Sequence, residues 1–256
     1  MADESGREFF GTAKDAKGTA ARQVISVDGL AGCGKTTLAR MLAERLGFIH
    51  LNSGLLYRAV AFLALQAKCS PDDEEALARL LVSYKLQLWG DASRGSRITI
   101  DGVDRTDELQ TPQISELTSK ASRHAQVREA LIPYQQEAFP GQGLVAEGRD
   151  MGTVVFKDSL VKFFVEVSEE VRVARRMGQY AAKGLSFGAE SGGQELRKNI
   201  EIEIRERDKR DQGRSEAPTK PATDAIFIDN SQQTLTLVLE NMYSLALSKG
   251  VVPAMR

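Results

Sequence analysis

The 256-residue sequence has few cysteines, no long apolar run and almost no net charge, and each shortage excludes a class of protein. Its two cysteines, Cys33 and Cys69, are too few for a disulfide framework, so a reducing cytoplasm is the expected location. No run approaches the roughly 18 apolar residues of a membrane span, and the first residues lack the apolar core of a secretory signal, so we expect no membrane partner. The 34 basic and 35 acidic side chains give a net charge of −1, so no global basic field predicts binding to nucleic acid.

One stretch organises the chain. The β-branched run 24–28 leads into GLAGCGKT at 29–36, and a helical pattern follows as far as Leu46. A strand, the motif G-x-x-x-x-G-K-T and a helix form the context in which this motif binds phosphate, because glycines with positive φ turn successive N–H groups inward and the helix N-terminus adds positive potential. We expect Lys35 to reach the β- and γ-phosphates and the Thr36 hydroxyl to join the Mg²⁺ shell. A chance glycine turn is the alternative, but the complete motif favours binding of a nucleoside triphosphate. The expected nucleotide-binding residues are Gly29, Leu30, Ala31, Gly32, Cys33, Gly34, Lys35, Thr36 and Thr37.

The remaining apolar runs predict how the domain is built. The length and a hydrophobic fraction of 42% suit one sizeable α/β domain with an insertion, and two small domains are the alternative. Residues 1–22 are polar and small apart from two phenylalanines, which predicts a flexible tail before a domain over 23–250. Five short strands that alternate with helices predict a parallel sheet of the P-loop kind, with ligands beyond the carboxyl ends of the strands. The strands are expected at 24–28, 48–51, 144–146, 161–166 and 225–229.

Two segments interrupt this alternation. Residues 84–89 and 97–100 alternate at period two around a turn, which predicts a β-hairpin inside an insertion over about 82–110. Residues 183–194 hold four glycines and three other small residues, a composition typical of a mobile loop, so we expect a lid over about 183–196. Among the helices, we expect one to start at Ser70, one to be kinked or split by Pro133 and the last to start at Ser231.

A second anion site is expected where the strand at 48–51 ends. Asn52 or Ser53 can cap the following helix, whose open N–H groups would face the first site. Tyr57 and Arg58 follow within a turn and bring an aromatic ring and a fork of donors to the same helix end. Ordinary helix capping without a ligand is the alternative.

Arginines indicate which chemistry the triphosphate site performs. Phosphoryl transfer needs cationic groups around the moving phosphoryl group more than it needs a covalent catalyst. Arg207, Asp211 and Arg214 fall on one face of a helix expected from Glu195 to about residue 212, although such charged faces are often only solvated. No N-K-x-D tetrapeptide supports a guanine-nucleotide switch, and neither of the two histidines lies in a context that suggests a catalytic triad. A kinase for a small anionic acceptor is therefore favoured over a switch or a non-catalytic nucleotide-binding protein. The arginines at the mouths of elements are Arg58, Arg128, Arg149, Arg176, Arg207, Arg210 and Arg214.

Four motifs in this order, GLAGCGKT, NSGLLYR, EGRDMGTVVF and IRERDKRD followed by Arg214, resemble the bacterial cytidylate kinases of the nucleoside monophosphate kinase family over roughly residues 23–248. The stretch 148–156 is particularly specific to that family. The resemblance implies a P-loop core, a β-rich insertion that closes over the monophosphate, a lid over ATP, and transfer from ATP to CMP or dCMP with Mg²⁺. ATP and Mg²⁺ are thus the expected cofactors, CMP or dCMP and ATP the expected small-molecule partners, and a monomer the expected state.

The resemblance also implies roles for individual residues. It places Ser53, Arg58, Arg149 and Arg207 at the CMP phosphate or sugar edge, and Ser119, Arg128 and Asp150 at cytosine. It places Asp211 at the ribose hydroxyls, and Arg176 and Arg214 near the transferring phosphate or the lid hinge. With Tyr57 these are the expected substrate-binding residues, and the expected catalytic set is Lys35, Arg149, Arg176, Arg207 and Arg214.

The chain departs from the family pattern in three places. Asn52 stands where the family usually has Asp, Glu147 replaces a shorter acid, and the lid is longer and richer in glycine. Because Asn caps a helix as well as Asp does, we expect activity to survive, although a metal-water role of that carboxylate is put in doubt. A kinase for UMP or AMP and a P-loop protein that has lost catalysis are the alternatives.

Overall fold

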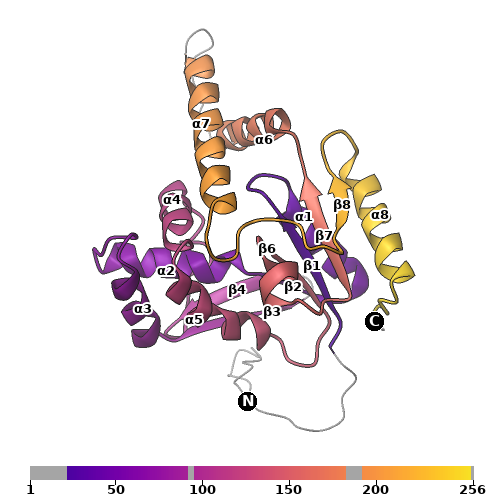
Figure 1. The fold of residues 1–256 in the computed structure, drawn as a ribbon, viewed down its shortest axis with the longest axis horizontal. Helices are drawn as coiled ribbons and strands as arrows, with labels where there is room; N and C mark the ends of the chain where they lie inside the picture. The colour runs from indigo at the N-terminus through magenta and orange to yellow at the C-terminus, as the bar shows by residue number, and fades with distance from the viewer. Residues whose placement is uncertain (1–21, 92–94, 183–191, 255–256) are drawn as a thin grey trace.

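A five-stranded parallel sheet forms the centre of the molecule, as the sequence predicted (Figure 1). The computed structural model describes residues 22–91, 95–182 and 192–254. The strand order is β2-β6-β1-β7-β8, and β1 pairs in parallel with β6 on one side and β7 on the other. The strands are β1 Val24–Gly29, β2 Ile49–Asn52, β6 Leu144–Gly148, β7 Val161–Glu166 and β8 Ile226–Asp229.

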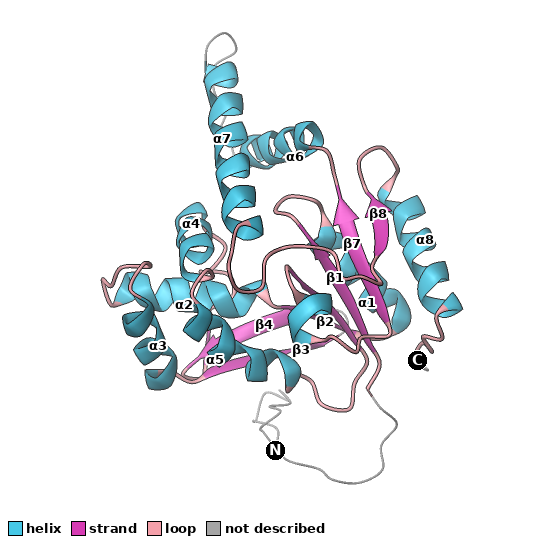
Figure 2. Ribbon diagram, viewed as in Figure 1, coloured by secondary structure: helices cyan, strands magenta, loops and turns pink. Residues whose placement is uncertain are grey.

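Helices cover both faces of this sheet, so two apolar cores form (Figure 2). Alternation along β1 sends Ile25 and Val27 toward one face, where they pack with helices α1 (Lys35–Leu46) and α8 (Leu235–Ser248). The opposite core is built around α2 (Gly54–Gln66), with contributions from the helices and strands that follow it. Gly47 ends α1 with φ 69°, as expected for a C-cap glycine.

The segment between α2 and β6 holds a small antiparallel sheet and three helices. The predicted hairpin is present as β3 and β4, whose register pairs Leu86 with Ile100, and a short third strand, β5, was not anticipated. This sheet packs beside β2, so the segment flanks the carboxyl ends of the central strands. Its elements are α3 Glu74–Ser83, β3 Leu86–Asp91, β4 Gly95–Ile100, β5 Val103–Asp104, α4 Pro112–Ala121 and α5 Ala125–Gln136.

Two expected helix starts differ in the structure, and of the kink or split expected at Pro133 the split is absent. Helix α3 starts after Asp73, whose Oδ1 accepts from Ala76 N at 2.9 Å, because Ser70 instead closes a turn with the Asp72 and Asp73 amides. Pro133 lies inside α5 without splitting it. Helix α8 starts after Thr234 and not at Ser231, whose amide donates to Asp229 Oδ1 in a turn.

Two helices project from the sheet beyond β7. Helix α6 (Glu169–Ala182) and α7 (Gly192–Gln212) contact each other through Val173, Ile200 and Ile204. Residues 183–191 of the expected lid lie outside the described residues, and so do residues 1–21 of the expected tail. No helix in the described part of the chain is long and apolar enough to cross a membrane.

Candidate active site

The loop between β1 and α1 has a backbone that only glycine allows at its key positions. Gly34 has φ 87°, and a Cβ there would lie 2.7 Å from the Asn230 side-chain amide. A Cβ on Gly29 would lie 2.5 Å from the carbonyl oxygen of Val165 on β7. The loop is thus packed against β7 and the segment after β8, which fixes its amides at the N-terminus of α1.

A cavity of about 850 Å³ opens at the carboxyl ends of the sheet strands and brings most of the expected site residues together. The expected residues that line it are Ala31, Gly32, Gly34, Lys35, Thr36, Thr37, Ser53, Tyr57, Arg58, Arg128, Arg149, Asp150, Arg176, Arg207, Asp211 and Arg214. Four others do not line it. Leu30 and Cys33 line a second cavity behind the loop, and Gly29 and the buried Ser119 line neither of the two. Neighbouring Thr118 and Ser122 of α4 face the large cavity instead of Ser119.

Lys35 and Thr36 begin α1 at the floor of this cavity. Lys35 is 7% exposed and its Nζ donates to the Leu30 carbonyl at 3.2 Å. Burial lowers the pKa of Lys35, and the nearby positive charges of Arg149 and Arg207 lower it further. The Thr36 hydroxyl donates to Glu147 Oε2 at 2.8 Å, so its lone pairs are left for another partner.

A buried ion pair forms another wall. Arg128 on α5 and Asp150, just after β6, are 5% and 2% exposed and hydrogen-bond through Arg128 Nη2 and Asp150 Oδ2. The guanidinium carbon of Arg128 lies 5.2 Å from the centre of the Tyr57 ring, and Nη1 donates to the Ser122 carbonyl at 3.0 Å. Burial raises the pKa of Tyr57 to about 12, so the phenol stays neutral. This wall presents a carboxylate acceptor next to guanidinium donors.

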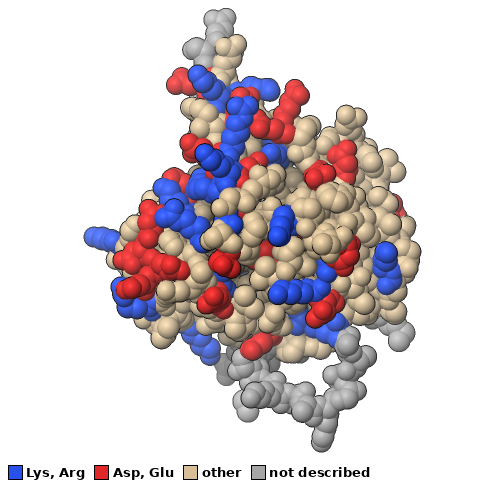
Figure 3. Space-filling view, in the orientation of Figure 1, with Lys and Arg blue, Asp and Glu red and all other residues tan. Residues whose placement is uncertain are grey.

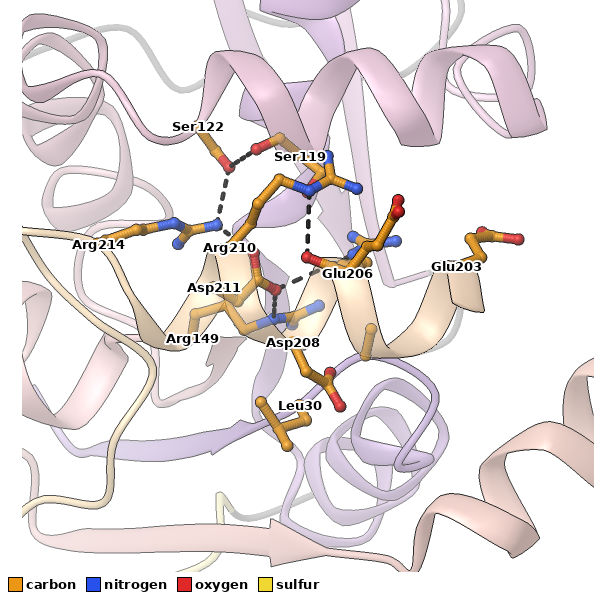
Figure 4. A network of polar contacts seen from close by, with 12 residues as sticks. Leu30, Ser119, Ser122, Arg149, Glu203, Glu206, Asp208, Arg210, Asp211 and Arg214 are labelled. Carbon is orange, nitrogen blue, oxygen red and sulfur yellow. Dashed lines mark hydrogen bonds and ion pairs between the residues drawn. The ribbon is translucent and has the colours of Figure 1, made fainter. Parts of the chain in front are cut away.

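Asp211 near the end of α7 gathers three arginines, two of which, Arg149 and Arg214, are labelled in Figure 4. It accepts from Arg149 Nε at 3.1 Å and from Arg214, and Arg207 Nε lies 4.0 Å away. Burial alone would raise the pKa of Asp211, but the charges of the arginines hold it below the ordinary value. Burial also lowers the pKa of Arg207 to about 10, with the charge of Arg149 acting in the same direction. Three cations for one carboxylate leave a local excess of positive charge suited to an anion.

Arg214 links this cluster to α4, because its Nη2 also donates to the Ser122 hydroxyl at 2.9 Å. Figure 3 shows lysine and arginine side chains along α7 and beside α4, interspersed with acidic ones. On this face the two charge signs are therefore mixed and do not form a single basic surface, in keeping with a net charge of −1.

At the expected second anion site, Asn52 is the one of the two foreseen capping residues whose side chain bonds the start of α2. Asn52 Oδ1 accepts from the Gly54 amide at 3.0 Å, whereas the Ser53 hydroxyl donates to the Glu147 carbonyl at 2.8 Å. Arg58 donates to the Leu109 carbonyl at 2.7 Å. Arg176 pairs with Glu203 of α7 at 3.2 Å, so it lies at the junction of α6 and α7.

Sequence reasoning missed residues that hold the phosphate loop from afar. Asn230 Nδ2 and Arg175 Nη1 both donate to the Cys33 carbonyl, at 2.9 and 3.3 Å, and Arg172 donates to the Ala31 carbonyl at 3.2 Å. The position of Asn230 directly after the fifth strand was a usable signal, since ligands gather at strand ends. The arginines of α6 gave no signal beyond their charge.

Two buried side chains behind the loop also matter. Asp28 on β1 accepts from the amides of Met151 and Gly152 at 2.9 and 2.8 Å, which ties the π-helical turn η1 (Met151–Val155) to the sheet. Burial raises the pKa of Asp28 to about 7, although the two amides act in the opposite direction. His50 is the other: it lines neither cavity, and its Nε2 lies 3.5 Å from Glu147 Oε1, a contact that the sequence did not indicate.

Comparison with known proteins agrees with this geometry. The family model described as cytidylate kinase matches residues 25–248. A cytidylate kinase of Pseudomonas aeruginosa strain LESB58 is 40% identical over 220 residues, which cover 86% of this chain and 93% of that protein. The cytidylate kinase of Geobacter sp. strain M21 is 39% identical, and the match covers 86% of this chain and 90% of that protein. The cytidylate kinase of Pasteurella multocida strain Pm70 is 40% identical, and the match covers 88% of this chain and 93% of that protein. The chain therefore belongs to the cytidylate kinase family.

Proposed function

We propose that this protein transfers the γ-phosphoryl group of ATP to CMP or dCMP, giving ADP and CDP or dCDP. The observation that carries the proposal is the buried pair of Arg128 and Asp150, which lines the same cavity as the phosphate loop. Cytosine offers an amino donor at C4 and acceptors at N3 and O2, so a carboxylate beside guanidinium donors complements its edge. Uracil reverses that pattern and would leave buried groups unpaired, at about 1–3 kcal/mol each.

The phosphate loop is the proposed ATP site. Its amides and the N-terminus of α1 would hold the phosphates, and Lys35 would neutralise charge on the β- and γ-phosphates. Since Lys35 is buried beside two arginines, a bound polyphosphate would relieve their mutual repulsion.

Mg²⁺ fits the residues at the start of α1. Thr36 Oγ1 has its proton committed to Glu147 Oε2, and hydroxyl and carboxylate oxygens are the donors that Mg²⁺ prefers. Mg²⁺ usually keeps several waters and binds through substrate phosphates, so Thr36 and Glu147 would supply only part of its shell. When bound, the ion would offset negative charge on the β- and γ-phosphates.

The remaining site residues divide between the acceptor and the moving group. Ser53 and Arg58 would hold the CMP phosphate, with Arg149 and Arg207 between the two substrates. Asp211 would accept from the ribose hydroxyls, and Arg176 and Arg214 would approach from α7 and its junction with α6. No covalent intermediate is needed, because positioned cations and exclusion of water carry the catalysis. The insertion over about 82–110 and the lid over about 183–196 would supply that exclusion in a cytoplasmic enzyme.

Phosphorus NMR tests the proposal directly. Incubation of the protein with ATP, CMP and Mg²⁺ should convert the γ-phosphate signal into the β-phosphate signal of CDP, and the Lys35→Ala variant should leave both substrates unchanged. Release of inorganic phosphate without CDP would contradict the proposal, because it would show hydrolysis in place of transfer.

A further inference from the structure

His50 is a buried histidine on β2 that faces the acid next to the phosphate loop. It is 4% exposed, and its Nε2 lies 3.5 Å from Oε1 of Glu147, which is 3% exposed. Neither of these two atoms has a hydrogen-bond partner among the described residues, so each is left to the other. The other oxygen of Glu147, Oε2, accepts from the Thr36 hydroxyl at 2.8 Å. The three side chains therefore form one line from β2 through β6 to α1.

The two ends of this line are held by the backbone. Parallel pairing of β2 with β6 sets Asn52 opposite Glu147 and fixes the strand that carries His50. The Ser96 hydroxyl of β4 donates to the His50 carbonyl and accepts from the Asn52 amide at 3.0 Å, so the small sheet clamps β2 at this point. The backbone that carries the imidazole is therefore fixed next to Glu147.

Glu147 needs such a partner more than a shorter acid would. Its longer side chain has one more rotatable bond, so a single hydrogen bond to Thr36 does not fix the orientation of the carboxylate. A buried carboxylate oxygen without a donor is also costly, and a ring N–H is the donor nearest to Oε1.

We propose that His50 is a positioning residue for the metal side of the ATP site. Its Nε2–H holds Oε1 of Glu147, Oε2 then takes the proton of the Thr36 hydroxyl, and the lone pairs of that hydroxyl are directed at Mg²⁺ bound with ATP. A hydroxyl oxygen offers its lone pairs to a metal best when its hydrogen is donated to another acceptor. Residues that hydrogen-bond to a metal ligand in this way, without touching the metal, typically contribute about 10–100-fold to metal affinity. The inference rests on the proposed use of Mg²⁺ and ATP.

Two substitutions separate positioning from packing. His50→Gln keeps an N–H donor near the place of Nε2, whereas His50→Leu fills the space without one. His124 is the matched control, because it is the only other histidine in the sequence and is also mostly buried. Its Nε2 lies 2.9 Å from the carbonyl oxygen of Pro71, which is not part of the phosphate loop. The measurement is calorimetric affinity for ATP with and without Mg²⁺, which needs no turnover.

We expect the gain in ATP affinity on adding Mg²⁺ to fall roughly tenfold in His50→Leu, the low end of the range for such partners. It should stay within about twofold of wild type in His50→Gln and His124→Leu, and the KM for CMP should change little in either His50 variant. If folded His50→Leu showed the same Mg²⁺-dependent increase in ATP affinity as wild type, the proposal would be overturned. Equal reductions of that increase in His50→Leu and His50→Gln would overturn it too.

Ring-nitrogen NMR gives a second test that does not depend on the folding of His50→Leu. Because the chain has two histidines, the spectrum holds two sets of signals that His124→Gln assigns. His50 should carry its proton on Nε2, and Glu147→Gln should shift the His50 signals and leave those of His124 in place. An unprotonated Nε2 would contradict the role. Absence of turnover with CMP would count against the proposed function only, because neither the calorimetric affinity nor the NMR spectrum depends on turnover.

Discussion

Replacing Asp211 by asparagine is the perturbation whose cost follows most directly from the structure. The amide keeps the shape of the carboxylate but removes the charge that faces Arg149, Arg207 and Arg214. Removing one partner of a buried ion pair costs about 3–5 kcal/mol, because the remaining charge stays buried. The Asp211 side chain is 2% exposed, but those of Arg149 and Arg207 are 18% and 21% exposed, so we expect the low end, about 3 kcal/mol.

Urea unfolding at neutral pH measures this cost as a change in the free energy of unfolding with an unchanged m-value. Asp224→Asn is the matched control. Its partner Lys162 lies 3.0 Å away and the Asp224 side chain is 61% exposed, so the same substitution should cost less than about 1 kcal/mol there.

Ligand rescue makes the reasoning sharper. In Asp211→Asn the three arginines lack their counter-charge, so inorganic phosphate should stabilise the variant more than it stabilises the wild type. A loss no larger than that of Asp224→Asn, or no extra stabilisation by phosphate, would refute the view that Asp211 holds together a cationic cluster.

Two further substitutions test neighbouring parts of the site. Lys35→Ala should lower kcat by at least about 10²–10³-fold, the loss seen when one donor to a developing charge is removed, with an unchanged circular dichroism spectrum; near-wild-type turnover in the folded variant would remove the phosphate-loop assignment. Asp28 has a folded-state pKa of about 7 against an ordinary value of 3.8, so the folded state holds this proton more tightly and the stability that it contributes is lost as pH rises from about 4 to about 7. That shift in pKa corresponds to about 4 kcal/mol. Asp28→Asn should therefore flatten the dependence of the unfolding free energy on pH over this interval. An unaltered slope in Asp28→Asn would show that another group causes the pH dependence.

The parts of the fold and of the site that could be predicted from the sequence are those formed by neighbouring residues in the chain. The strand, glycine loop and helix at 24–46 could be predicted because local pattern and motif agree. The resemblance pointed to Arg128 and Asp150 as site residues, but not to the buried ion pair that they form. Start sites of helices were less certain, since Ser70 and Asp73 compete to cap the same helix and only packing decides.

Contacts between distant segments had no local signature. Asn230 reaches the Cys33 carbonyl across 197 positions; its place after a strand points to the edge of the sheet where ligands bind, but not to Cys33. In the sequence, His50 is a single residue between two apolar residues of a strand. Its position beside Glu147 depends on how β2 pairs with β6. Such residues become visible only when the sheet order is known.

The specificity for the acceptor base tests the central claim most directly. We expect coupled ADP release to give a kcat/KM for CMP at least about a hundredfold above that for UMP, since sites built on hydrogen-bond pairing discriminate by up to roughly 10⁴. Asp150→Ala should shrink this ratio mainly by impairing the reaction with CMP. Comparable efficiencies for CMP and UMP in the wild-type protein would contradict the assignment of the Arg128 and Asp150 pair to cytosine, whereas a hundredfold preference that collapses in Asp150→Ala is the result that the account predicts.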